Sequence, residues 1–172
     1  MKTILVLAMF LCAFFAHAAD TAAISVYFSP TGGCSAAVVK ELNGAKSNVL
    51  IQAYSFTSKD IARAVVDAHK RGVDVRIILD KSNETDMYSA ASFVAHAGLP
   101  TLIDARHAIA HNKVMVIDDQ TVITGSFNFT TAAEEDNAEN LLILHNRKLA
   151  QKYIANWHTH AAHSPPYKPP TD

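Results

Sequence analysis

Residues 111–128 read HNKVMVIDDQTVITGSFN, two short apolar runs separated by the polar letters DDQ. Each apolar run predicts a β-strand, and the polar break predicts a hairpin turn between them. Side chains i and i+2 of a strand lie on one face, so His111 and Lys113 stand side by side where the hairpin begins. Ser126 and Asn128 do the same where it ends. An imidazole, an ammonium, a hydroxyl and a carboxamide that converge in this way suit a phosphate ester.

The spacing within this stretch forms the pattern H-x-K-x4-D-x6-G-S-x-N. Its fixed positions are His111, Lys113, Asp118, Gly125, Ser126 and Asn128. On these residues the chain resembles the phospholipase D superfamily, and within it the small periplasmic endonucleases that carry one copy of the motif. The resemblance runs from about Ile24 to Trp157 and is most specific over residues 106–140. The competing interpretation is a polar hairpin of an α/β domain, with His111 as a core histidine whose hydrogen bonds are satisfied.

The resemblance implies a role for each polar residue of the motif. His111 would attack phosphorus and form a phosphohistidine, which water then resolves. Lys113, Ser126 and Asn128 would hold the non-bridging oxygens as donors aimed at the developing charge. We expect no metal ion or other cofactor in the reaction, because Lys113 already supplies the positive charge that a cation would bring.

Asp118 and Gly125 have structural explanations. Asp118 lies at an odd offset from Lys113, which directs it to the opposite face of a regular strand. Aspartate in a turn commonly bonds backbone amides, so we expect Asp118 to hold the hairpin and not to act as an acid. Gly125 removes a side chain where backbone and ligand would approach closely.

Glu139 is our candidate for the acceptor that holds the second nitrogen of His111 and so sets its tautomer. It lies in Asn137–Asn140, which resembles the acidic segment that follows the motif in these nucleases. The preceding carboxylates, Glu134 to Asp136, are interpreted as a solvated loop. A metal site built from this carboxylate cluster is the alternative.

The motif occurs once in the chain. One imidazole cannot easily attack phosphorus from one side while it protonates the leaving oxygen on the other. Superfamily members with two motif copies place both histidines in one site. A single-copy chain achieves the same arrangement only across a twofold axis, so we predict a homodimer in which His111 of each subunit enters one shared active site.

The first 18 residues predict a secretory signal peptide, with a basic start, a short apolar run and a small-x-small end at Ala16-His17-Ala18. The apolar run is shorter than the roughly 20 residues of a membrane span, so an uncleaved anchor is the weaker alternative. Cleavage after Ala18 predicts a periplasmic or secreted chain of 154 residues that is not stably inserted in the membrane and keeps Cys34 as its single cysteine. Without Lys2 there remain 14 basic and 16 acidic residues, so DNA would have to bind through a local patch.

The order of apolar and amphipathic segments predicts one α/β domain over residues 19–163, followed by a proline-rich tail, 164–172, expected to be frayed. Besides the hairpin, strands are expected near residues 24–28, 48–54, 73–79, 101–103 and 140–144. Helices are expected near residues 35–44, 57–72, 85–97 and 149–157, with Met87 facing inward in the third. The fold class is a mixed, largely parallel sheet with helices on both faces, an α-β-α sandwich.

Weaker signals are left with two interpretations each. Arg106 and His107 could line the cleft. Tyr54 and Phe56 are either walls of the site or, more commonly for such residues, part of the core. His158-x-His160-x2-His163 has a loosely metal-like spacing, but a solvated helix end is favoured. Gly32-Gly33 before a helix could hold a phosphate, but a simple turn is favoured.

The leading hypothesis is a metal-independent phosphodiesterase that acts as a non-specific endonuclease on DNA, with RNA as a second substrate. The alternative is a phospholipase D or cardiolipin hydrolase that uses the same chemistry on a lipid headgroup. A catalytically silent α/β binding module is the third interpretation.

Overall fold

The computed structural model describes residues 23–169 of the 172-residue chain. Its strands are β1 (Ala23–Ser29), β2 (Asn48–Ala53), β3 (Asp74–Asp80), β4 (Thr101–Asp104), β5 (Lys113–Ile117), β6 (Thr121–Gly125) and β7 (Glu139–His145). Its helices are α1 (Cys34–Gly44), α2 (Lys59–Lys70), α3 (Ala91–His96), α4 (Thr131–Glu135) and α5 (Arg147–Ala161), with a 3₁₀ turn, η1 (Lys81–Glu84). The predicted signal peptide lies outside the described residues. No helix between residues 23 and 169 is long and apolar enough to cross a bilayer.

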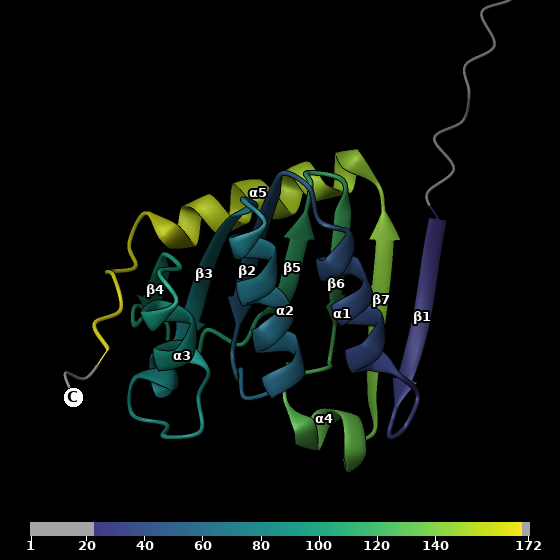
Figure 1. The fold of residues 1–172 in the computed structure, drawn as a ribbon, viewed down its shortest axis with the longest axis horizontal. Coiled ribbons are helices and arrows are strands. Elements are labelled where there is room, and N and C mark those ends of the chain that lie inside the picture. Colours follow the sequence, from purple (N-terminus) through teal and green to yellow (C-terminus); the bar gives the residue numbers. More distant parts are fainter. Residues whose placement is uncertain (1–22, 170–172) are drawn as a thin grey trace, which may run out of the picture.

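The strands form one open sheet in the order β1-β7-β6-β5-β2-β3-β4 (Figure 1). The predicted mixed sheet with helices on both faces is confirmed. Five strands run in one direction, but only the β2–β3 and β3–β4 pairings are parallel, so "largely parallel" does not describe the pairing. The physical reason is that β5, β6 and β7 insert between β1 and β2, and β1 pairs with β7 instead of its sequence neighbour.

Strand β5 is buried on both faces. Met115 and Ile117 belong to the core beneath α1 and α2, whereas Val114 and Val116 belong to the core beneath α5, which crosses the opposite face of the sheet (Figure 1). A strand covered on both sides needs apolar residues at every position, which explains why β5 reads as a continuous apolar run after Lys113.

The helix predicted over residues 85–97 is wrong in its first half, since α3 contains only Ala91–His96. Met87, expected to face inward, is 85% exposed. The reason is local competition for backbone groups: the Asp86 carboxylate accepts from Tyr88 N at 2.9 Å, and such side-chain bonds favour a turn over a helix.

The first residues of the proline-rich tail are not frayed. Ile103 N donates to the Pro165 carbonyl at 2.9 Å, and Tyr167 N donates to the Thr101 carbonyl at 2.8 Å. Pro166 forms a bridge with β4, so this segment covers the outer edge of the sheet. An unpaired edge strand exposes backbone groups that invite aggregation, and the tail satisfies those of β4.

Cys34 is fully buried at the start of α1, and it is the only cysteine among the described residues. Burial, followed by the nearby charges of Glu134 and Glu139, raises the pKa of its thiol to about 11.

We therefore expect no labelling of native protein by a thiol reagent at pH 8, and complete labelling in denaturant, measured by absorbance of the released chromophore. Labelling of Cys34 in native protein as fast as in a short peptide would contradict its placement.

Candidate active site

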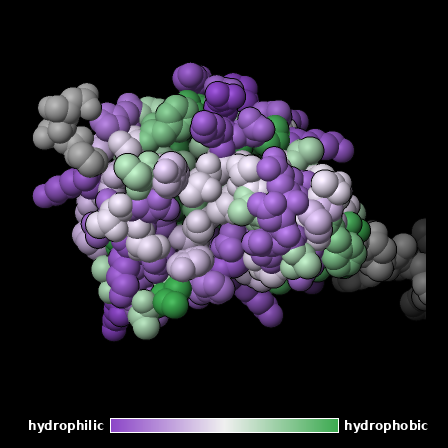
Figure 2. All heavy atoms as spheres, turned by 90° about the horizontal axis from the view of Figure 1, so that it is seen from below, coloured by the Kyte–Doolittle hydropathy of each residue, from purple (hydrophilic) through white to green (hydrophobic). Residues whose placement is uncertain are grey.

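The motif residues gather where four strands share one end of the sheet. At this end β2 finishes beside the start of β5, with Ala53 paired with Lys113, and β6 finishes beside the start of β7, with Gly125 paired with Leu141. This end is the lower one in Figure 1, and Figure 2 shows it face on. Hydrophilic and weakly polar residues cover most of that face, and hydrophobic residues form separate small patches (Figure 2).

His111 is exposed, and its ring packs on Tyr54 with 4.6 Å between centroids and a 53° tilt. Lys113 lies beneath, only 7% exposed, with Nζ 5.0 Å from the centre of the same Tyr54 ring. The ammonium donates to the His111 carbonyl at 2.9 Å. The exposed imidazole and the buried ammonium therefore both lie against the Tyr54 ring, so the structure brings the two predicted residues together.

Burial lowers the pKa of Lys113, and the charge of Glu139 acts in the opposite direction. A desolvated ammonium has few water molecules to satisfy its protons. It is therefore a strong donor for an anionic ligand that replaces that water.

Ser126 and Asn128 follow β6 at the same end of the sheet. Ser126 Oγ accepts from Asn140 N at 3.0 Å and from Asn140 Nδ2 at 3.4 Å, which leaves the hydroxyl proton free to donate. Asn128 Oδ1 is buried without a hydrogen-bond partner among the described residues. This oxygen is an acceptor, so it is the Nδ2 group of Asn128 and the hydroxyl proton of Ser126 that could donate to a phosphate oxygen.

Glu139, at the start of β7, makes no hydrogen bond to His111 within residues 23–169. Its Oε1 accepts instead from Asn137 Nδ2 at 3.4 Å, and its charge acts on Lys113. The sequence-based role of Glu139 as the acceptor for His111 stays a prediction.

Asp118 lies at the far end of the hairpin from His111. Its carboxylate accepts from the backbone N–H groups of Lys46, Ser47 and Asn48 at 2.7–3.2 Å, and from the Ser47 hydroxyl at 2.8 Å. Positive φ angles of 52° and 56° at Asp118 and Asp119 define the tight hairpin turn that the sequence predicts. The carboxylate thus bonds backbone amides, as expected, and ties the hairpin to the segment that joins α1 to β2.

Gly125 serves a close approach between strands. A Cβ at this position would lie 2.2 Å from the Asn140 carbonyl oxygen of β7, and φ is +152°. The sequence-based expectation was an approach to ligand, whereas the observed neighbour is protein backbone. Because Asn140 also bonds Ser126, this close contact sets the position of the site hydroxyl.

The loop of residues 105–112 carries His111 and is held on both sides of it. Asp80 Oδ2 accepts from Ala110 N at 2.7 Å, and Tyr54 N donates to the Asn112 carbonyl at 2.8 Å. Asp80 is a supporting residue that the motif does not contain. The signal that could have revealed it is a carboxylate directly after a buried parallel strand.

The glycine turn before α1 is closed by a carboxylate of this chain. Glu134 accepts from Gly33 N at 3.0 Å and from Ser35 N at 2.7 Å. The interpretation of Glu134 as a solvated loop residue is therefore wrong, because the helix amides that could hold a phosphate attract its charge instead.

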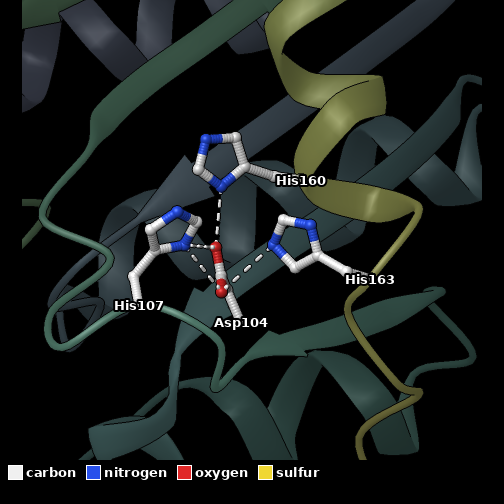
Figure 3. Close-up of side chains that lie close together, drawn as sticks. All are labelled: Asp104, His107, His160 and His163. Atoms are coloured by element: carbon white, nitrogen blue, oxygen red, sulfur yellow. Dashed lines mark hydrogen bonds and ion pairs between the residues drawn. The ribbon is translucent and has the colours of Figure 1, made fainter.

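The other residues that the sequence left with two interpretations lie in different parts of the structure. Phe56 is fully buried and belongs to the core, whereas Tyr54 belongs to the site. His107 does not point toward His111: its ring faces Asp104 together with His160 and His163 (Figure 3). The solvated helix end expected for the last two histidines is wrong.

Comparison with known proteins agrees with this architecture. The family model described as "Cardiolipin synthase, PLD-like domain" matches residues 38–160. The crystal structure of Nuc from Salmonella typhimurium, a phospholipase D family member, aligns with a TM-score of 0.82 and 39% identity, covering 86% of this chain and 99% of that one. NucT from Helicobacter pylori aligns with a TM-score of 0.79 and 25% identity over 85% of this chain and 99% of that one.

Curated relatives carry lipid-related names. A protein of Rickettsia prowazekii named "Phospholipase D" is 42% identical over 134 residues, which are 78% of this chain and 65% of the relative. The mouse "Mitochondrial cardiolipin hydrolase" is 31% identical over 68% of this chain and 53% of its own length. This chain thus spans about two thirds of the first relative and half of the second. The chain belongs to the phospholipase D superfamily and is a hydrolase of phosphodiesters.

The Asp118 bonds generate a prediction about stability and pH. Burial alone would raise the pKa of Asp118, but hydrogen bonds from Ser47, Lys46 and Asn48 outweigh it and lower the pKa. A carboxyl whose pKa is lower in the folded state stabilises the fold at pH values above its unfolded-state pKa. That stabilisation is lost as the pH falls through its folded-state pKa. Asp118→Asn should therefore cost about 1–3 kcal/mol at pH 7, with the difference from wild type shrinking below about pH 4.

Urea unfolding of both proteins across this pH range measures the difference. Asp119→Asn is the matched control. Asp119 lies in the same turn as Asp118, and its side chain makes no hydrogen bond among the described residues. Equal losses for the two variants would show that the carboxylate of Asp118 has no special role.

Proposed function

We propose that this chain is a metal-independent endonuclease that hydrolyses DNA, and also RNA, through a phosphohistidine on His111 at a site shared by two copies. The observation that carries the proposal is that the exposed imidazole of His111 and the buried ammonium of Lys113 both lie against the Tyr54 ring. The nucleic-acid substrate is supported by the alignment with Nuc over 99% of that chain's length. The overall charge of −1 does not favour it, so binding relies on the local donors of the site.

The reaction follows from these positions. A nitrogen of His111 attacks phosphorus as the bond to the leaving oxygen breaks, and an acid on the opposite side protonates that oxygen. Water then attacks the phosphohistidine, loses its proton to the same group, and the P–N bond breaks. Lys113, Ser126 and Asn128 stabilise the charge on the non-bridging oxygens in both steps. When a phosphate binds, it draws the ammonium of Lys113 toward the phosphate. Glu139 then orients the imidazole of His111.

A second imidazole is needed for the proton transfers. Among the described residues, three of the other histidines surround Asp104 and His145 bonds a threonine of β6. His69 lies in the last turn of α2, His96 bonds Ser92 of its own helix, and His158 lies against Trp157. The partner subunit's His111 is the group that a twofold axis through the open end of the sheet would supply.

A lipid substrate is the second candidate, because large apolar side chains are exposed in residues 87–93 and in the loop that carries His111. Met87 is 85% exposed, Tyr88 78%, Phe93 50% and Ile109 56%. The names of the rickettsial and mitochondrial relatives point the same way. A patch of this kind could insert among lipid headgroups.

His111→Gln should lower kcat at least about 10³-fold on the true substrate, because it removes the nucleophile. Plasmid DNA, RNA and cardiolipin-containing vesicles are offered separately in excess chelator, well below the melting temperature. We expect wild type to cleave DNA under these conditions and the exposed control His158→Gln to match wild type. Cleavage of the vesicles alone would replace the nuclease by a lipase, and loss of all activity in chelator would overturn the mechanism.

Mixing experiments test the shared site. If each site needs two copies of His111, then after subunit exchange an equimolar mixture of wild type and His111→Gln retains about one quarter of the activity of the same total amount of wild type. Independent sites would retain about one half. Activity is measured as initial nicking rate, with Asp119→Asn in place of His111→Gln as the mixing control.

A further inference from the structure

Four side chains from separate segments converge on one point outside the candidate active site (Figure 3). Asp104 ends β4, His107 lies in the following loop, His160 is in the last turn of α5, and His163 follows that helix. His160 Nδ1 lies 2.7 Å from Asp104 Oδ2, and His107 Nδ1 lies 3.0 Å from the same oxygen. His163 Nε2 lies 3.4 Å from Oδ1.

The carboxylate at the centre is completely buried, whereas the side chains of His160 and His163 are 15% and 16% exposed. A lone carboxylate in so buried a place would be costly. Three imidazoles around one carboxylate provide the compensation.

A purely structural role for this cluster leaves one nitrogen unexplained. His163 Nε2 is buried and lies 3.4 Å from Asp104 Oδ1, within ion-pair distance, but among the described residues it has no partner with hydrogen-bond geometry. A buried ring nitrogen without a partner loses free energy unless something meets its lone pair. The nitrogen points at the carboxylate, as Figure 3 shows, toward the centre of the cluster.

We propose that Asp104, His107, His160 and His163 bind one divalent transition-metal ion of the zinc type. Three imidazoles and one carboxylate are a donor set that Zn²⁺ favours, and tetrahedral coordination places such donors roughly 3.3 Å apart. The four donor atoms lie within 4.8 Å of one another, so rotations of the side chains suffice to close the site. For His107 and His160 to coordinate through Nδ1, the ring proton must lie on Nε2, and a neutral imidazole reaches that tautomer without net loss of a proton.

The position of the site indicates what the ion does. It joins the end of α5 to the loop that carries His107 and, four residues later, His111. An open pocket lined by Arg106, Thr159 and Ala162 as well as the histidines gives solvent access. The ion therefore stabilises the loop and the helix end, and it takes no part in the bond-breaking at His111.

The test uses the purified full chain, stripped of metal with a chelator and titrated with Zn²⁺ by calorimetry. We expect one Zn²⁺ per chain, a higher melting temperature with the ion, and the intense visible absorption of tetrahedral cobalt when Co²⁺ replaces it. His160→Ala and His163→Ala should each weaken Zn²⁺ affinity at least tenfold and abolish the cobalt spectrum. His158→Ala is the matched control, because His158 is on the same helix but packs edge to face against Trp157, outside the cluster.

His107→Ala, whose side chain is 45% exposed in the wild type, is the second variant in case loss of the more buried rings prevents folding, and circular dichroism checks the fold of each. Failure of folded wild type to bind Zn²⁺, or equal affinity in wild type, His107→Ala and His160→Ala, would overturn the proposal. His111→Gln should bind Zn²⁺ like wild type, so the metal site and the proposed reaction succeed or fail separately.

Discussion

The burial of β5 on both faces of the sheet is the constraint on which the other features depend. Its four apolar residues separate two cores, one beneath α1 and α2 and one beneath α5. A strand in this position cannot slip by one residue, because a shift would exchange the faces of every side chain and bring Lys113 into a core. Lys113 can therefore occupy one position only, at the edge of the core where its ammonium reaches the end of the sheet.

The two ends of this hairpin have different tasks. At one end Asp118 bonds the loop between α1 and β2, so the turn cannot move away from the sheet. At the other end Lys113 and Ser126 face the candidate active site, and Gly125 allows β7 to approach closely enough for Asn140 to hold the Ser126 hydroxyl. The aspartate of the motif, Asp118, thus acts on the fold, at a distance from the candidate active site.

The loop before β5 contains no helix or strand of its own, so other contacts must hold it in place. Asp80 and Tyr54 hold its end near His111, and the Asp104 cluster holds its beginning near His107. Both carboxylates end neighbouring parallel strands, β3 and β4, and each is almost completely buried. Buried carboxylates with several donors fix a loop more firmly than exposed ion pairs do, since solvent does not screen them.

Local patterns were sufficient for much of this structure. The strand pair around Asp118 and the neighbouring positions of His111 and Lys113 follow from period-two alternation, which needs no knowledge of distant residues. The same reasoning failed for residues 85–90, where side chains such as Asp86 bond nearby amides and prevent the helix that the apolar spacing indicated. It also failed for Glu134, because its partners at Gly33 and Ser35 are about 100 residues away in the sequence.

By itself, the sequence determined the family and the hairpin, and it named the side chains that we propose to react, because these depend on residue type and short spacing. Only the tertiary structure decided that β1 pairs with β7, that Gly125 makes room for Asn140, and that three histidines meet at Asp104. Each of these depends on contacts between segments far apart in the chain. Such contacts are selected by the joint packing of the whole sheet and its helices, which no local pattern records.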